Sequence, residues 1–177
     1  FRDHLHFKNT LLVEQPNGHW GDTITRSFLM DTFNFYLYDS LRTCGVDSIQ
    51  AIAEKAIKEI SYQAQWSAEW IVRLGDGTEE SHAKVQESID NLWMWSGELF
   101  ENHPIYEVLN GELPSFTSIK DPWLKKVGQV LKIGTLIMPS PELWMQTGGR
   151  FGVHSKELGF ILGEMQSLAR SYPNATW

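Results

Sequence analysis

The chain has 177 residues, of which 42% are hydrophobic, 12% aromatic and 21% charged, a composition typical of one globular domain over residues 1–177. Its 15 Lys and Arg residues against 22 Asp and Glu residues give a formal net charge of -7, which disfavours nucleic acid and anionic membranes as partners. The single cysteine, Cys44, permits no internal disulfide and suits a reducing compartment such as the cytoplasm. No apolar run approaches the roughly 20 residues that a membrane-spanning helix needs.

The first predicted elements surround the turn at residues 16–18, Pro-Asn-Gly. The residues before this turn are expected to be the end of a helix. After it, a helical period predicts a helix over residues 22–43, which ends before Gly45. One face of this helix carries Asp31 together with the apolar residues Ile24, Phe28, Phe35 and Tyr38. The sequence therefore places an acidic residue on an apolar helix face.

Two further helices are expected in the middle of the chain. A helix is predicted over residues 47–74, where Asp47 and Gln50 resemble a capping box. Thr78 is a natural N-cap for the next helix, which the pair His103-Pro104 should end. Residues 102–120 lack a sustained period and are interpreted as a long connection.

The last third of the chain predicts two more helices. Asp121 and Pro122 favour an N-cap and a first helical residue, in a helix that runs to about residue 133. A turn at residues 148–150 then leads into the last helix, whose predicted buried stripe is His154, Leu158, Ile161, Met165, Leu168 and Tyr172. No segment alternates with the period of a strand. The expected architecture is an all-α bundle of long antiparallel helices.

Long helical bundles with inward-facing acids suggest a di-iron carboxylate site. Such a site needs a Glu from each of two helices and a Glu-x-x-His pair from each of the other two. Only His82 has a Glu three residues before it, at Glu79, and both fall in the first turn of a helix, where acids commonly face the helix dipole. Asp3 and His6 form a weaker Asp-x-x-His pair with no second partner.

Where central ligands are expected, the pairs are incomplete. Glu59 is followed three residues later by Tyr62 instead of His, and Glu164 is followed by Ser167. Asp31, Glu59, Tyr62, His154 and Glu157 are therefore interpreted as remnants of a metal site, buried polar groups that satisfy one another or bind water. We expect no metal ligand, no catalytic residue and no cofactor site among them.

Several segments of the sequence resemble a known family. They are LLVEQPNGHWGDTITRSFLMD (11–31), AEKAIKEISYQ (53–63), WIVRLGDGTEES (70–81), LWMWSGELF (92–100) and TGGRFGVHSKELGFILGEMQSLARSYPNATW (147–177). In this order they are similar to the PaaC-like subunits of phenylacetyl-CoA 1,2-epoxidase complexes of phenylacetate degradation. The resemblance covers essentially the whole chain.

The resemblance implies a ferritin-like helical bundle and a structural role. In that family the di-iron centre belongs to a related catalytic subunit, so iron is expected in the partner and no cofactor in this chain. Family members carry roughly 70 more residues before the position of Phe1, enough for the opening helices of such a bundle. Residues 1–15 would then be the tail of a helix. An apolar face exposed in this way would be covered by the partner subunit or by a second copy of the chain.

Two other functions remain open from the sequence. The chain could be a di-iron oxygenase in its own right, with Asp31, Glu59, Glu157 and His154 as ligands. It could also be a self-associating ferritin-like module without an oxygenase role. Residues 102–120 and 148–150 are the segments that we expect to contact a partner.

Overall fold

The computed structural model describes residues 6–102, 104 and 111–176, and these residues form helices and connecting loops without any strand. The all-α fold class expected from the sequence is confirmed. The α-helices are α1 (Trp20–Leu41), α2 (Asp47–Gly75), α3 (Glu79–Trp93), α5 (Thr117–Ile133) and α6 (Lys156–Ser171). Three short 3-10 helices accompany them: η2 (Leu11–Glu14), η3 (Gly97–Phe100) and η4 (Gly149–Phe151).

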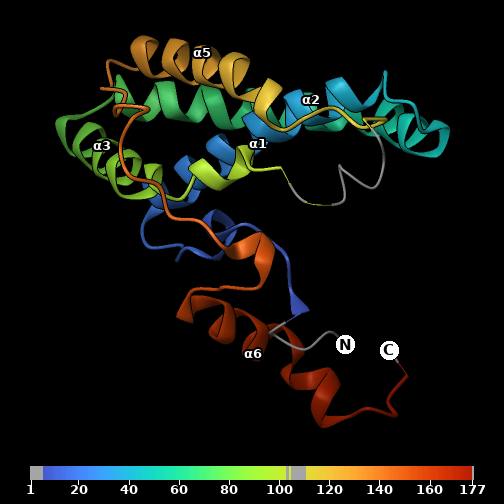
Figure 1. Cartoon of the computed structure of the whole chain (residues 1–177). Helices are drawn as coiled ribbons and strands as arrows, with labels where there is room; N and C mark the ends of the chain where they lie inside the picture. Colours follow the sequence, from blue (N-terminus) through green and yellow to red (C-terminus); the bar gives the residue numbers. More distant parts are fainter. Residues whose placement is uncertain (1–5, 103, 105–110, 177) are drawn as a thin grey trace.

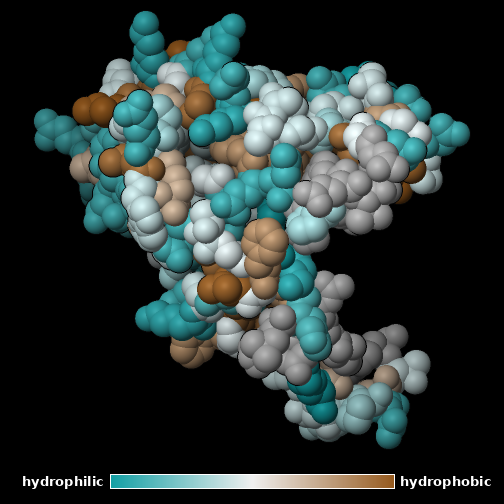
Figure 2. Space-filling view, viewed as in Figure 1, coloured by the Kyte–Doolittle hydropathy of each residue, from teal (hydrophilic) through white to brown (hydrophobic). Residues whose placement is uncertain are grey.

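The helices form two parts, which we call the body (α1, α2, α3 and α5) and the arm (α6) (Figure 1). In the body, α1 packs against α2, α3 and α5, and α2 also packs against α3 and α5. Helix α6 lies apart from these four helices, and its principal element contact is η2. Apolar residues are visible on the surface below the body in the same view (Figure 2). The described part of the chain contains no helix that is long and apolar enough to cross a membrane.

Aromatic residues fill the core of the body. The largest fully buried side chains include Trp93, Trp123, Phe28 and Phe33. The indole N–H of Trp123 donates to the carbonyl oxygen of Leu29 at 3.0 Å, which satisfies a buried donor and joins α5 to α1. Leu12 of η2 is completely buried in the same core, so the segment before α1 is anchored by apolar packing.

The predicted N-cap of α3 is confirmed, whereas the start of α1 and the capping of α2 differ from the prediction. Thr78 caps α3, because its hydroxyl oxygen accepts from the Ser81 N–H at 3.2 Å. Helix α1 begins two residues before the expected position, with His19 as N-cap and Asp22 as its capping-box partner. The expected capping box of α2 is wrong, since Val46 is the N-cap and the Gln50 amide donates to the Arg42 carbonyl oxygen at 2.6 Å.

Two predicted boundaries in the second half of the body are also wrong. Helix α3 ends at Trp93 rather than near residue 102, and the Ser96 hydroxyl donates to the Trp93 carbonyl oxygen that the helix leaves open. Helix α5 begins at Thr117, where the Asn102 side chain accepts from the Phe116 N–H at 3.2 Å. Pro122 therefore lies in the second turn of α5 instead of at its first residue. Residues 103 and 105–110 of the expected connection lie outside the described residues.

The segment before η2 and the start of the last helix differ from the prediction as well. Residues 7–10 carry no helix and lead into η2, so the expected helical tail is absent from the described part of residues 1–15. His154 does not belong to the stripe of the last helix, because α6 begins at Lys156 with Ser155 as its N-cap. Both segments contact each other through His154, whose ring nitrogens lie against Glu14 and the carbonyl oxygen of Phe7, and these contacts replace the expected helical ones.

Candidate functional site

The expected metal-site remnants do not form one group. Asp31 is half-buried on α1, and burial raises its pKa above the ordinary value although a hydrogen bond with Ser67 of α2 opposes this shift. Glu59 and Tyr62 lie on the exposed surface of α2, with Tyr62 69% exposed, so the expected burial of Glu59 is a wrong prediction. Within the described residues, no three His, Cys, Asp or Glu side chains are grouped as metal ligands.

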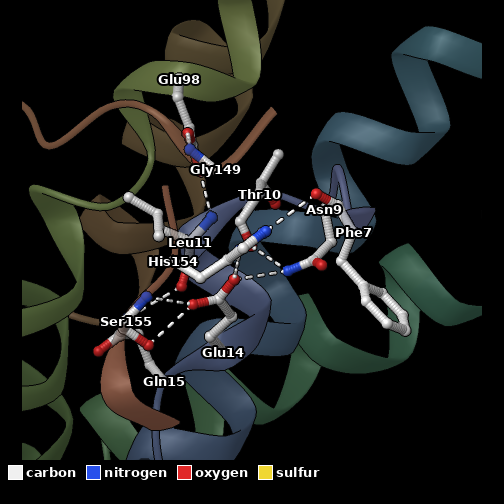
Figure 3. A network of polar contacts seen from close by, with 10 residues as sticks. All are labelled: Phe7, Asn9, Thr10, Leu11, Glu14, Gln15, Glu98, Gly149, His154 and Ser155. Carbon is white, nitrogen blue, oxygen red and sulfur yellow. Dashed lines mark hydrogen bonds and ion pairs between the residues drawn. The ribbon is translucent and has the colours of Figure 1, made fainter. Parts of the chain in front are cut away.

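His154 lies instead in a buried polar network at the junction of the arm and the body (Figure 3). Its Nδ1 is 2.6 Å from Oε1 of Glu14, and its Nε2 is 2.9 Å from the carbonyl oxygen of Phe7. Both contacts are with oxygen atoms of the chain itself. Both ring nitrogens are thereby engaged within the chain.

Glu14 is the centre of this network and is 1% exposed. Its Oε1 also accepts from the Asn9 amide at 2.7 Å. Its Oε2 accepts from the backbone N–H and from the hydroxyl of Ser155, each at 2.8 Å. Because Ser155 is the N-cap of α6, the Glu14 carboxylate holds the first turn of the arm against η2.

A second buried carboxylate holds η2 from another direction. Glu98 of η3 is completely buried, and its two oxygens accept from the backbone N–H groups of Leu11 and Gly149 (Figure 3). Burial raises the pKa of Glu98, while these two N–H donors act in the opposite direction. A side chain on Gly149 would place a Cβ 2.5 Å from the Asn9 carbonyl oxygen, so only glycine fits at this contact.

We call Glu14, Glu98, His154 and Ser155 the clamp. All four oxygens of its two carboxylates accept hydrogen bonds from groups of the chain. The clamp therefore positions segments far apart in the sequence. It also shows that the turn at residues 148–150 is largely an internal contact, since Gly149 is buried and Arg150 stacks over Phe116 at 4.2 Å.

Few features of the sequence indicate the clamp. Glu14 follows the apolar run Leu11-Leu12-Val13 and Glu98 precedes Leu99-Phe100, so each is an isolated acid beside buried residues. An acid in such a place must have partners if it is buried. No local pattern identifies the partner of Glu14, because His154 lies 140 residues later in the chain.

Glu157 and an aromatic cluster lie outside the clamp. Glu157 is half-buried in the first turn of α6, with Oε1 at 3.7 Å from the Lys156 ammonium. On the α1–α2 side of the body, Trp20, Trp66 and Trp70 form a cluster with ring centroids 5.8–6.3 Å apart. Trp20 is 48% exposed and Trp66 39% exposed, which is typical of aromatic residues at protein contacts.

Comparison with known proteins identifies the family. The family described as "Phenylacetic acid catabolic protein" matches residues 1–177. This chain belongs to that family. A relative from Escherichia coli (strain K12), the C subunit of its 1,2-phenylacetyl-CoA epoxidase, is 37% identical over 178 residues, which cover 99% of this chain and 71% of the relative. The family resemblance identified from the sequence motifs is confirmed.

Within this member of the family, Asp31→Asn tests whether the half-buried carboxyl group has a partner that stabilises its charge. The pKa of Asp31 in the folded chain lies above its ordinary value of 3.8, so the group stabilises the fold when protonated and loses that contribution as the pH rises through the folded pKa. We therefore expect the Asn variant to gain stability relative to the wild type as the pH increases from below 3.8 to neutral.

Chemical denaturation at a series of pH values measures this difference, with the exposed Asp121→Asn as the matched control. A difference between Asp31→Asn and the wild type that stays constant with pH, or that turns against the variant at neutral pH, would contradict the expectation. The second result would indicate that a cation pairs with Asp31.

Proposed function

We propose that this chain is a non-catalytic structural subunit of a phenylacetyl-CoA 1,2-epoxidase complex and supports the subunit that holds the di-iron centre. The similarity to the Escherichia coli epoxidase C subunit over nearly the whole chain supports the assignment to this complex. The observation that supports the non-catalytic role is the set of contacts made by His154, because both of its ring nitrogens contact oxygen atoms of the chain itself.

The described residues do not fit a di-iron centre. A di-iron carboxylate site places Glu and His side chains inward between helices. Here Glu59 and Tyr62 are exposed, and the buried Glu14 and Glu98 have both of their oxygens occupied by N–H and O–H donors. The iron is accordingly assigned to the partner subunit, and no reaction step is assigned to this chain.

The chain would then act through its surfaces. The di-iron catalytic subunit is the principal proposed partner, a second copy of the chain is a further one, and the cytoplasm is the proposed location. Exposed aromatic residues such as Trp20 and Trp66 support a role in protein contacts, because large apolar side chains at a surface gain most from burial against a partner.

Elemental analysis of iron tests this function. The full-length protein is purified alone and, separately, in complex with its catalytic subunit. We expect no stoichiometric iron in the protein alone and about two irons per catalytic subunit in the complex, as a di-iron carboxylate centre requires. Close to two irons in the protein alone would overturn the non-catalytic role and favour an oxygenase in its own right.

A second measurement tests the link to the epoxidase. The catalytic subunit should co-elute with this protein in size-exclusion chromatography at micromolar concentration. Its failure to do so, together with stable self-association of this protein, would favour a self-associating module without an oxygenase role.

A further inference from the structure

The turn between η2 and α1 contains an Asn-Gly pair that is exposed to solvent. Asn17 and Gly18 both lie on the surface of the structure. In such a pair the backbone nitrogen of the glycine lies close along the chain to the amide carbon of the asparagine side chain, and a bond between them closes a succinimide ring. Glycine hinders this attack least, because it has no side chain. The pair therefore has the composition of a reactive site.

The start of α1 requires glycine at position 18. The φ angle of Gly18 is +46°, in the left-handed region that favours glycine. A Cβ on this residue would overlap the carboxylate of Asp22. That carboxylate is held in place, because its Oδ2 accepts from the His19 N–H at 3.0 Å and its Oδ1 accepts from the Ser88 hydroxyl at 2.8 Å. The capping of α1 thus keeps the least hindered residue beside Asn17.

The backbone nitrogen of Gly18 is accessible for this reaction. Among the residues that the structure describes, none accepts a hydrogen bond from its N–H. The carbonyl oxygen of Asn17, in contrast, accepts from the Thr23 hydroxyl at 3.0 Å. The turn is therefore anchored to α1, while the N–H that must lose its proton faces no acceptor of the chain.

The side chain of Arg26 acts on the other reacting group. Its guanidinium donates to the side-chain oxygen of Asn17 and to the carbonyl oxygens of Gln15 and Pro16. These contacts hold the planar guanidinium in one orientation. A cation that donates to a carbonyl oxygen makes its carbon more electrophilic and stabilises the negative charge that develops on the oxygen during attack. Arg26 therefore lies where an oxyanion donor is needed.

We propose that Asn17 is a site of spontaneous deamidation, in which the nitrogen of Gly18 attacks the side-chain amide carbon and Arg26 stabilises the developing oxyanion. The Gly18 nitrogen bonds to Cγ of Asn17 and gives its proton to solvent. The bond from Cγ to Nδ2 then breaks, and ammonia leaves with a proton from solvent. Water opens the succinimide at either carbonyl, which produces aspartate or isoaspartate at position 17.

The reaction needs only water and groups of this chain. An amide and water become a carboxylate and ammonium, so no oxidant or reductant takes part. The inference therefore does not rest on the proposed function, and it holds for the chain alone or within a complex that leaves the turn exposed.

The aspartate product changes the environment of Arg26. Burial lowers the pKa of Arg26 below its ordinary value, and the charge of Asp22 opposes this shift. A carboxylate at position 17 would replace a neutral acceptor of the guanidinium by a charged one, which makes a stronger hydrogen bond. Isoaspartate would instead add a methylene to the backbone between η2 and the N-cap of α1. The two products therefore have opposite effects on the order of the turn.

Peptide mapping by mass spectrometry measures the reaction in the full-length protein during incubation in mildly alkaline buffer. Fragmentation of the peptides distinguishes aspartate from isoaspartate. The sequence contains a second Asn-Gly pair at Asn110 and Gly111, which serves as an internal reference in the same molecule. Arg26→Gln removes the cation, and the matched control Arg42→Gln removes an exposed arginine at the end of α1. Circular dichroism checks that helix content is unchanged.

In the wild type we expect both aspartate and isoaspartate to accumulate at position 17. Arg26→Gln should slow this reaction by roughly tenfold, less than the loss of an oxyanion donor costs in an enclosed site, because water screens the charge here. The rate at Asn110 should be the same in all three proteins, and Arg42→Gln should leave the rate at Asn17 unchanged. Loosening of the turn would act in the opposite direction, because a more mobile side chain reaches the Gly18 nitrogen more easily.

The contrary outcomes are distinct. An Asn17 that stays unmodified throughout, whether or not Asn110 reacts, would overturn the site. A rate at Asn17 that is unchanged or faster in Arg26→Gln would overturn the role of Arg26 and show that its hydrogen bond does not promote the reaction. Aspartate without isoaspartate would overturn the succinimide route, because direct hydrolysis of the side-chain amide produces aspartate alone.

Discussion

Replacing Glu14 by alanine is expected to lower the free energy of unfolding by about 3–5 kcal/mol, because several buried hydrogen-bond partners lose this carboxylate and the truncation leaves a cavity. The carboxylate is 1% exposed and accepts from Asn9, His154 and twice from Ser155. All of these donors would lose an acceptor in a space that alanine leaves empty. Chemical denaturation monitored by circular dichroism measures the change.

The matched control for this substitution is Glu54→Ala, which removes the same carboxylate from an exposed position of α2. It should change stability by no more than about 0.5 kcal/mol. A loss below about 1 kcal/mol for Glu14→Ala would contradict the clamp, since that is the size of one ordinary hydrogen bond.

Glu14→Gln gives a second measurement that a simple loss of stability does not predict. The amide keeps the side-chain shape but has only one acceptor oxygen, so it cannot accept from both Asn9 and Ser155, which bind different oxygens of Glu14. We expect hydrogen exchange to accelerate in α6 more than in α1 or α2, because α6 is held chiefly through this junction. Equal acceleration in all helices would show that the arm unfolds only with the body.

The sequence predicts the elements that local signals define. Thr78 caps α3 because its hydroxyl bonds to a residue three positions later, and helix α2 follows its period to the Gly75 that ends it. The clamp could not be predicted in this way. The geometry of His154 depends on Glu14 and Phe7, both more than one hundred residues earlier, as their sequence separations of 140 and 147 show.

Hydrophobic period also identifies a face without identifying what covers it. The stripe of α6 has the expected spacing, yet Met165 and Leu168 are exposed. The same holds for α2, where Ile52 is 62% exposed and shares the outer surface with Glu59 and Tyr62. In both helices the period identifies an apolar face, and the prediction that this face lies in the core of the described residues is wrong.

Replacing Glu98 by alanine is the second large effect that we expect, a loss of about 2–4 kcal/mol in the free energy of unfolding. Glu98 is completely buried, and both N–H groups that it binds, those of Leu11 and Gly149, belong to buried residues. Each donor left without an acceptor costs about 1–3 kcal/mol, and the partial relief of removing a buried charge reduces the sum. Denaturation of the variant beside the exposed Glu87→Ala measures the loss.

The two carboxylates should act together, because both fix η2. Glu14 lies at its end, and Glu98 binds the N–H of Leu11 at its start. Once either side chain is lost, η2 is less well held and the other has less to stabilise, so the double variant should lose less than the sum of the single losses by about 0.5–3 kcal/mol. Losses that add within about 0.3 kcal/mol, the limit for independent sites, would show that the clamp is two separate contacts.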